Sequence, residues 1–312
     1  MKRIVIIILL VSMLTVALSA CNSRKYDAAF DLINNGDYIA AYELFCELDD
    51  YKNSQDELKK FHYVPTKIVV KTDNTENKDT GDLTVSYNEQ NLPSRIIAHT
   101  NNGQNGIIDF SYDGNGNLIQ QVQINPNGDK TTYEYIYDHN NNRIKTILTD
   151  YEGNKSTTDS TYDDKGHLVK LTTINSNDSS IIFYNYYTYD ENGNLVKQVS
   201  TNSNNSSSDN SFIDYIYDEN GNLIKKVWNI TNDVEETTIY TYDERGNLVK
   251  QVEITISGAE YIYEYDYDDI GNLIRKTTTS PDGEKQILEI TYKFVYTQFD
   301  FSFESFLENI LF

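Results

Sequence analysis

The chain has 312 residues and a formal net charge of −22, because 48 Asp and Glu outnumber 26 Lys and Arg. This acidic balance excludes nucleic-acid binding, which requires a surplus of basic residues to neutralise phosphates. The 2 cysteines are too few for a disulfide scaffold, and the 4 histidines do not form a metal-ligand pattern.

The first 21 residues have the pattern of an export signal. A basic pair at positions 2–3 precedes an apolar stretch over residues 4–18, which is short for a membrane-spanning helix. The stretch ends in Leu18-Ser19-Ala20-Cys21, which resembles the bacterial lipobox. The resemblance implies that residues 1–20 are a lipoprotein signal peptide and that the thiol of Cys21 is lipidated. We therefore expect an extracytoplasmic protein, anchored by lipid to the bacterial cell membrane or envelope.

Residues 21–62 are expected to form the lipid anchor and a small helical segment. Apolar residues recur at helical spacing over 28–33 and again over 39–45, with a C-cap signal at Asn34-Asn35-Gly36 between them. This pattern resembles one tetratricopeptide-like helical hairpin, and a single such repeat is not stable alone. We expect it to cap the next domain or to space it from the membrane, with peptide binding as the alternative. Cys46 is expected to be a buried, inert thiol.

Residues 63–82 are expected to be a linker with a first strand, and a repeat of about twenty-five residues then fills positions 83–297. Its anchor is Tyr-Asp-x-x-Gly-Asn-Leu, as at Tyr217–Leu223. Successive anchor tyrosines are 25 residues apart, apart from steps of 27 and 28 on the two sides of Tyr189. The anchor tyrosines, including degenerate first and last copies, are Tyr87, Tyr112, Tyr137, Tyr162, Tyr189, Tyr217, Tyr242, Tyr267 and Tyr292.

Each repeat predicts a β-hairpin. One strand follows the anchor, as at Leu248–Ile254, and a second strand leads to the next anchor, as at Tyr261–Tyr267. The second strand has Tyr at every second position, which is the period of a strand, so its tyrosines point to one face of the sheet. The repeats therefore predict an antiparallel β-meander of about eight hairpins, with an aromatic layer on one face.

The anchor predicts a type I turn that runs into a left-handed glycine at a G1 bulge. The Asp carboxylate can accept a backbone N–H two residues further on. Asn91 and Asn141 replace the glycine in two anchors, and Asn tolerates the same conformation. The candidate structural turn residues are Asp113, Gly116, Asp163, Gly166, Asp190, Gly193, Asp218, Gly221, Asp243, Gly246, Asp268 and Gly271.

These anchors resemble the YD-repeat, or Rhs-repeat, family of bacterial surface and toxin proteins. The resemblance implies a long meander that coils into a shell, which in large members encloses a toxic C-terminal segment. This chain lacks the core motif that precedes such a segment, and its repeats are few, so the toxin-shell function is not expected.

The expected fold class is mainly β, with a curved open sheet of hairpins. Phe303, Phe306, Leu307 and Ile310 recur at helical spacing in the tail. Because an open repeat sheet needs its last edge or aromatic face covered, we expect residues 298–312 to form a C-terminal capping helix.

The sequence contains no recognisable catalytic motif, and no carboxylate stands out from its equivalents in the other repeats. We expect a protein that is not an enzyme and that needs no cofactor. Calcium is the alternative, because Asp190, Asn192 and Asn194 place oxygens at alternate positions, although the distal Glu of a calcium loop is missing.

The expected function is a non-enzymatic scaffold at the cell surface that binds a neutral glycan on its tyrosines, or a protein partner. The negative charge repels polyanions, which argues against acidic glycans as well as nucleic acid. Two alternatives stay open: an extracellular hydrolase acting on polysaccharide or peptide, and a Ca²⁺-stabilised adhesion module.

Overall fold

The computed structural model describes residues 22–48, 51–72, 81–99, 103–176, 181–204, 211–231 and 234–297. The expected signal peptide, the lipidation site Cys21 and the C-terminal cap at 298–312 lie outside these residues. The chain divides into two compact units. The β unit consists of Thr66–Ser86 and Pro93–Thr291, and the helical unit gathers the helices with Tyr87–Leu92 and the end of the last strand.

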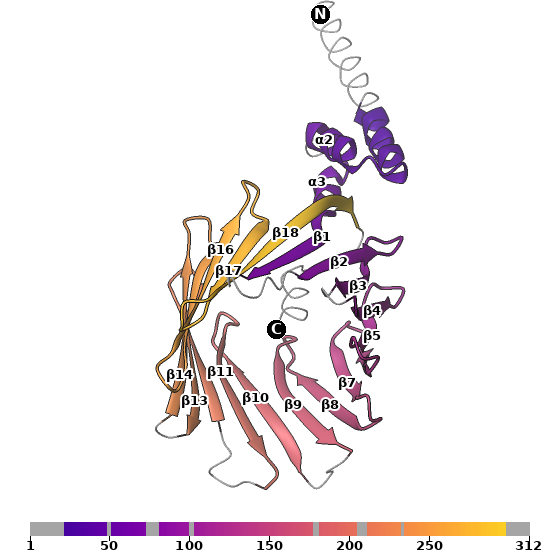
Figure 1. Ribbon diagram of the computed structural model, residues 1–312. Helices are drawn as coiled ribbons and strands as arrows, with labels where there is room; N and C mark the ends of the chain where they lie inside the picture. The colour runs from indigo at the N-terminus through magenta and orange to yellow at the C-terminus, as the bar shows by residue number, and fades with distance from the viewer. Residues whose placement is uncertain are drawn as a thin grey trace, which may run out of the picture. The chain divides into compact units, whose positions relative to one another are not determined.

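The β-strands are short, mostly of seven to nine residues, and follow one another along the chain (Figure 1). Among the described residues they are β1 (Phe61–Thr72), β2 (Gly81–Tyr87), β3 (Pro93–His99), β4 (Gly106–Tyr112), β5 (Leu118–Ile124), β6 (Lys130–Tyr137), β7 (Arg143–Thr149), β8 (Lys155–Tyr162), β9 (Leu168–Asn175), β10 (Ile182–Tyr189), β11 (Leu195–Asn202), β12 (Ser211–Tyr217), β13 (Leu223–Thr231), β14 (Val234–Tyr242), β15 (Leu248–Ile254), β16 (Glu260–Tyr267), β17 (Leu273–Thr279) and β18 (Lys285–Tyr296).

The sheet closes on itself, so the prediction of a curved open sheet is wrong. Strands that are adjacent in sequence pair antiparallel, and β1 pairs with both β2 and β18. Across the closing pair, Thr66 Oγ1 donates to the carbonyl oxygen of Thr291 at 3.2 Å, and Lys71 forms an ion pair with Glu289. The closing strand β1 (Phe61–Thr72) overlaps the segment 63–82, which was expected to contain a linker and a first strand. Closure removes both exposed edges, which an open sheet would have to protect.

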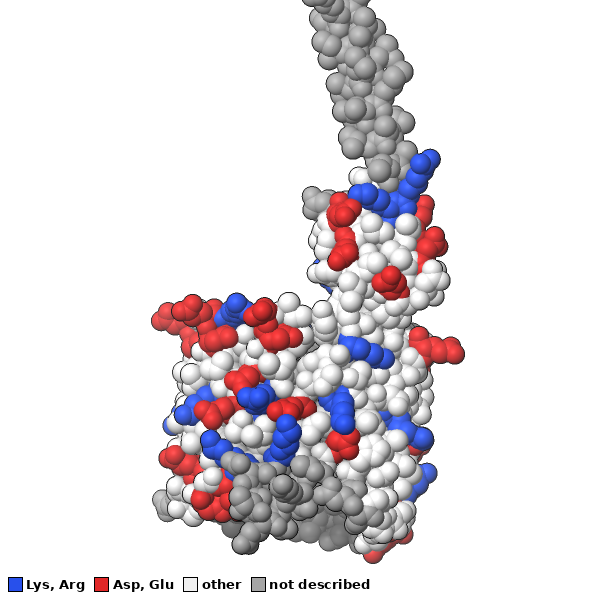
Figure 2. Space-filling view, turned by 45° about the horizontal axis from the view of Figure 1, so that its top comes forward, with Lys and Arg blue, Asp and Glu red and all other residues white. Residues whose placement is uncertain are grey.

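The strand register gives the closed sheet two different faces. The outer face carries ion pairs between neighbouring strands, and Figure 2 shows acidic and basic residues interspersed on the surface of the β unit. Outer side chains are the more exposed: Ile216 is 44% exposed, whereas Gln121 on the inner face is 6% exposed. The outer ion pairs are Lys67–Asp82, Lys71–Glu289, Arg95–Asp109, Lys145–Asp159, Lys197–Asp214, Arg275–Asp266 and Arg275–Glu289.

Tyrosines line the inner face, because alternate residues of a strand share a face. Tyr184 and Tyr186 are exceptions, since they pair with Thr172 and Lys170 on the outer face. The inner tyrosines are Tyr112, Tyr133, Tyr135, Tyr137, Tyr162, Tyr187, Tyr189, Tyr215, Tyr217, Tyr240, Tyr242, Tyr261, Tyr263, Tyr265 and Tyr267.

Six of the anchor tyrosines each link their own turn to the preceding turn. The hydroxyl of Tyr242, for example, donates to the carbonyl oxygen of Leu223, which is the first residue after the previous turn, at 2.9 Å. The bond is repeated at 2.8–2.9 Å from Tyr137 to Leu118, Tyr162 to Arg143, Tyr189 to Leu168, Tyr217 to Leu195 and Tyr267 to Leu248.

Within each anchor turn the aspartate uses both carboxylate oxygens. Asp218 Oδ1 accepts the backbone N–H groups of Asn220 and Asn222 at 2.9 and 2.8 Å. Its Oδ2 accepts the side-chain amide of Asn222 at 2.9 Å, a bond that explains the Asn of the anchor and that the sequence analysis did not foresee. Gly221 has a φ of 86°, and Asn141, where glycine is missing, has a φ of 63°.

The helical unit contains a helix over residues 22–34, α2 (Tyr38–Leu48) and α3 (Ser54–Leu58). No described helix has the length and apolar composition needed to cross a membrane. Its core consists of Ala29, Ala41, Phe45, Leu48, Phe61 and Tyr296. Cys46 is exposed, so the expectation of a buried thiol is wrong: the side chain lies off the buried stripe of α2.

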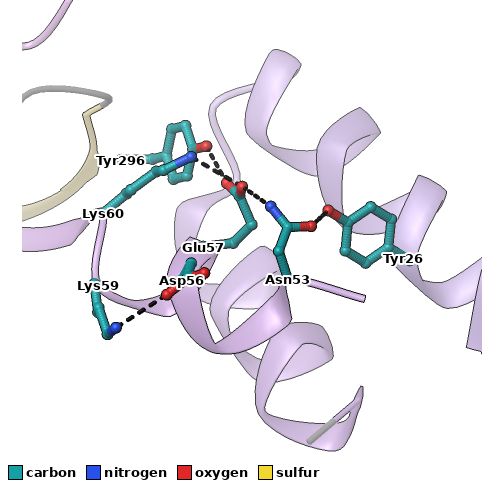
Figure 3. Close-up of polar contacts among 7 residues, drawn as sticks. All are labelled: Tyr26, Asn53, Asp56, Glu57, Lys59, Lys60 and Tyr296. Atoms are coloured by element: carbon teal, nitrogen blue, oxygen red, sulfur yellow. Dashed lines mark hydrogen bonds and ion pairs between the residues drawn. The ribbon is translucent and has the colours of Figure 1, made fainter. Parts of the chain in front are cut away.

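A buried carboxylate joins α3 to the end of β18 within the helical unit (Figure 3). The side chain of Glu57 is 4% exposed, and its Oε1 accepts hydrogen bonds from Asn53 Nδ2 at 2.8 Å and from Lys60 Nζ at 2.9 Å. Its Oε2 accepts the hydroxyl of Tyr296, and Tyr26 in turn donates to Asn53. Burial and the bond to Glu57 raise the pKa of Tyr296.

Replacing Gly221 with valine should destabilise the protein more than replacing it with asparagine. No atom lies within 4 Å of the position that a Cβ at Gly221 would occupy, so the cost comes from the backbone conformation alone. Because a β-branched residue resists a positive φ, we expect Gly221→Val to lower the free energy of unfolding by about 1–2 kcal/mol more than Gly221→Asn. Urea denaturation followed by circular dichroism measures the difference.

Gly114 provides a matched control, because it lies in an anchor turn, has the same open surroundings and does not have a positive φ. Asparagine and valine should have similar effects there. An equal effect of the two substitutions at Gly221 would contradict the left-handed turn as the reason for its glycine.

Candidate functional site

The predicted turn residues lie at the anchor turns, spread around one edge of the β unit, and do not converge on one site. In each of these turns hydrogen bonds within the turn occupy the aspartate, as for Asp190, whose pKa is lowered by the side-chain and backbone N–H groups of Asn194. In the turn that begins at Asp163, His167 replaces the asparagine, and its Nδ1 lies 3.1 Å from Asp163 Oδ2. Among the described residues, no three His, Cys, Asp or Glu side chains are grouped as metal ligands would be.

The inner face combines aromatic rings with side-chain amides in a regular pattern. The hydroxyl of Tyr265 donates to Gln251 Oε1 at 3.2 Å. The same contact recurs from Tyr215 to Gln198 at 3.3 Å and from Tyr135 to Gln121 at 3.5 Å. In each of the three cases the glutamine is the ninth residue after an anchor tyrosine, so the strand register brings it beside the tyrosine of a neighbouring strand.

Burial keeps the inner hydroxyls protonated, because an ionised phenolate is disfavoured away from water. It raises the pKa of Tyr135 to about 12 and that of Tyr240 to about 12. The inner face therefore offers half-buried rings whose hydroxyl groups donate hydrogen bonds over the whole physiological pH range.

One polar cluster interrupts the pattern on β15, β16 and β17. The hydroxyl of Tyr263 donates to Glu253 Oε2 at 2.8 Å, and Gln251 Nε2 donates to Glu253 Oε1 at 2.9 Å. Lys276 Nζ lies 5.0 and 5.8 Å from the ring centroids of Tyr263 and Tyr265. Lys276 is 9% exposed, and this burial lowers its pKa to about 8. The polar groups of this cluster are thus largely occupied by one another.

Sequence reasoning placed the tyrosines on one face but missed the residues that accompany them. Gln121, Gln198, Gln251 and Lys276 all stand nine residues after an anchor tyrosine, a spacing that is visible in the sequence. What the sequence does not give is that this position faces inwards beside a tyrosine of the next strand, which depends on the bulge at each turn.

No family model matches any part of the chain, and no curated protein matches it. Two solved structures of porin-like proteins are similar to it. The one from Bacteroides uniformis covers 73% of this chain and 98% of its own, at 13% identity and a TM-score of 0.41. The one from Bacteroides vulgatus covers 74% of this chain and 99% of its own, at 12% identity and a TM-score of 0.36.

A third structure, a putative 6-phosphogluconolactonase from Bacteroides uniformis, covers 74% of this chain and 99% of its own at 10% identity and a TM-score of 0.11. These scores are too low to transfer a fold or an activity. The resemblance to a YD-repeat surface lipoprotein with a tetratricopeptide-like hairpin is nevertheless wrong: no family model supports it, and the sheet is closed.

Replacing Lys276 with glutamine should stabilise the protein more at pH 7 than at pH 9.5. The folded-state pKa of Lys276 is about 8, below its ordinary value of 10.5. Between pH 8 and pH 10.5 the unfolded chain therefore binds more protons at this residue than the folded chain does. Stability contributed through Lys276 therefore rises with pH across this window, and the charged lysine costs on the order of 1–3 kcal/mol at pH 7. Thermal unfolding of the parent and of Lys276→Gln at pH 7 and pH 9.5 measures the difference in stability.

Glutamine is suited to the test because Gln121, Gln198 and Gln251 occupy the equivalent position. Lys226→Gln makes the same change at another equivalent position and controls for the loss of a lysine as such. A difference between Lys276→Gln and the parent that is the same at both pH values would contradict a buried, destabilised charge at Lys276.

Proposed function

We propose that the protein is a non-enzymatic, extracytoplasmic binding protein, held at the membrane by a lipid on Cys21. Its ligand is a neutral glycan, which binds to the tyrosine-rich inner face of the β unit. The observation that carries the proposal is the division of the sheet into an ion-paired outer face and an inner face of rings and amides.

The ion pairs on the outer face support the proposal that the sheet is surrounded by water and not by lipid. A membrane-embedded barrel presents an outward apolar band, and a Lys or Arg on its lipid face costs about 2–4 kcal/mol at the bilayer midplane. Here Lys145 pairs with Asp159, and Lys197 with Asp214, in the middle of outer strand surfaces. Exposed pairs of this kind are compatible with water, where they add little to stability. Membrane attachment is therefore assigned to the N-terminal lipid.

The side chains of the inner face support the proposal that the ligand is neutral and rich in hydroxyl groups. Aromatic rings offer apolar surface, and a small number of placed amides and hydroxyls give orientation, as binding sites generally require. The apolar faces of a sugar ring match the tyrosine rings, and its hydroxyls match the glutamine side chains. With a net charge of −22, the protein repels acidic polymers, which favours a neutral glycan.

Binding, rather than catalysis, suits the regularity of the site. Catalysis needs nucleophile, base and electrophile groups in one constellation. The Tyr–Gln contact instead recurs in three separate strand pairs, and Glu253 accepts hydrogen bonds from Tyr263 and Gln251. A repeated array can contact a repeated polymer at several points.

The proposal is tested by titrating the mature protein with neutral and acidic oligosaccharides in a calorimeter. We expect binding of a neutral oligosaccharide and no binding of a polygalacturonate of equal length at physiological salt. Tight binding of the acidic polymer alone would contradict the proposal. A pull-down from the surface fraction, run in parallel, tests the alternative that the partner is a protein.

The lipid anchor is tested by exchanging residues 1–21 for a signal peptide that is cleaved without lipidation. The exported chain, which then starts at Asn22, should appear in the soluble fraction, because its outer face is charged. Cys21→Ala in the parent should abolish lipid labelling. Retention of the exchanged chain in the membrane fraction would contradict attachment through the lipid and would indicate an embedded sheet.

A further inference from the structure

The repeat allows equivalent positions on the inner face to be compared, and one repeat is exceptional. The eleventh residue after an anchor tyrosine is Gln123, Leu148, Thr173, Ser200, Trp228, Glu253 or Thr278 in successive repeats. Trp228 is the only tryptophan of the chain. Since the other repeats have polar residues or leucine at this position, the fold does not require an indole there.

Trp228 lies on the inner face of β13, between two neighbouring strands. It stands opposite Ile213 of β12 and opposite Glu236 of β14. Lys226, two residues earlier, shares this face and stands opposite Tyr215. Trp228 is 39% exposed, so a large part of its ring is accessible although it lies on the more buried face of the sheet. Directly opposed Cβ atoms in antiparallel strands are about 4.5–5.5 Å apart, so Glu236 flanks the indole.

The surroundings of Trp228 differ from the polar cluster on β15 to β17. There, Tyr263, Gln251 and Glu253 are bonded to one another. Within the part of the chain that the structure describes, by contrast, no hydrogen bond, ion pair or ring contact links Lys226, Trp228 or Glu236 to another side chain. The ammonium of Lys226, the indole of Trp228 and the carboxylate of Glu236, which lie close together on the inner face, are therefore available to bind a ligand.

We infer that Lys226, Trp228 and Glu236 form the primary contact for a neutral saccharide, an inference that rests on the proposed function. A sugar ring stacks on the exposed indole, one hydroxyl accepts a hydrogen bond from Lys226 Nζ, and another donates to Glu236. A group that both donates and accepts, such as a hydroxyl, satisfies a cation and an anion side by side. An anionic ligand would satisfy Lys226 but meet the carboxylate of Glu236.

The single tryptophan makes the test direct, because all indole fluorescence comes from Trp228. The mature protein is titrated with three neutral hexasaccharides, of β-glucose, of β-mannose and of N-acetylglucosamine, while emission and acrylamide quenching are recorded. We expect the saccharide that binds to shift the emission and to protect the indole from acrylamide. Binding measured by calorimetry without any change at Trp228 would overturn the inference.

Substitutions give a second readout, taken by calorimetry. Trp228→Leu should weaken binding by about tenfold or more, and Lys226→Gln by a smaller factor. Leu148 and Gln198 stand at the equivalent positions of other repeats, so both variants should fold, which their melting temperatures check. Lys276→Gln, the same change within the occupied cluster of the inner face, should weaken binding less than Lys226→Gln does.

The outcomes separate this inference from the function on which it rests. Binding that is unchanged in Trp228→Leu would overturn the site and leave glycan binding in place. Equal losses in Lys226→Gln and Lys276→Gln would also overturn it, because the wall would then act without a preferred subsite. No binding of any of the three saccharides by the parent would contradict the proposed function itself.

Discussion

The bond from an anchor tyrosine to a backbone carbonyl at the preceding turn, which six anchors form, is the interaction on which the sheet depends. The bond from Tyr242 to Leu223 spans nineteen residues and joins two turns that are otherwise separate. Because it repeats from Tyr137 to Tyr267, successive turns stay at one edge in constant register. A slip of one residue would turn every side chain to the opposite face, so this register also decides which residues line the inner wall. The aspartate of each turn supports it by fixing the backbone that carries the tyrosine.

The distribution of side chains over the two faces follows from closure. A closed sheet has one concave face, where neighbouring side chains crowd one another, and one convex face open to water. Tyrosines suit the concave face because their rings lose water while their hydroxyls still find partners, as Tyr215 does with Gln198. Lysines and carboxylates suit the convex face because their charges stay hydrated. Some charged residues nevertheless stand on the inner face, namely Lys226, Glu236, Glu253 and Lys276. Of these, Lys276 is placed among rings and has a lowered pKa because of its burial.

The sequence predicted much of the local structure and little of the closure. Strand positions, the antiparallel order and the aromatic face follow from period-two tyrosines and the regular spacing of the anchors. Closure could not be predicted, because β1 has no anchor and its pairing with β18 joins segments far apart in sequence. The inner glutamines, Lys226 and Trp228 were missed for a related reason. Which face of the sheet they lie on depends on the bulge at each turn, such as that between Ile216 and Tyr217. A local sequence pattern does not reveal this face.

The closing strand also has a consequence for how the chain folds. Among the described strands, every pairing except that of β1 with β18 joins strands that are consecutive in the sequence, so hairpins can form one after another at low entropic cost. The pairing of β1 with β18 joins Lys71 to Glu289, 218 residues apart. During synthesis or export from the N-terminus, β1 emerges first and its second partner last. Until then both sheet edges stay open to other chains, so the fully made protein gains its protection from strand exchange in a single final step.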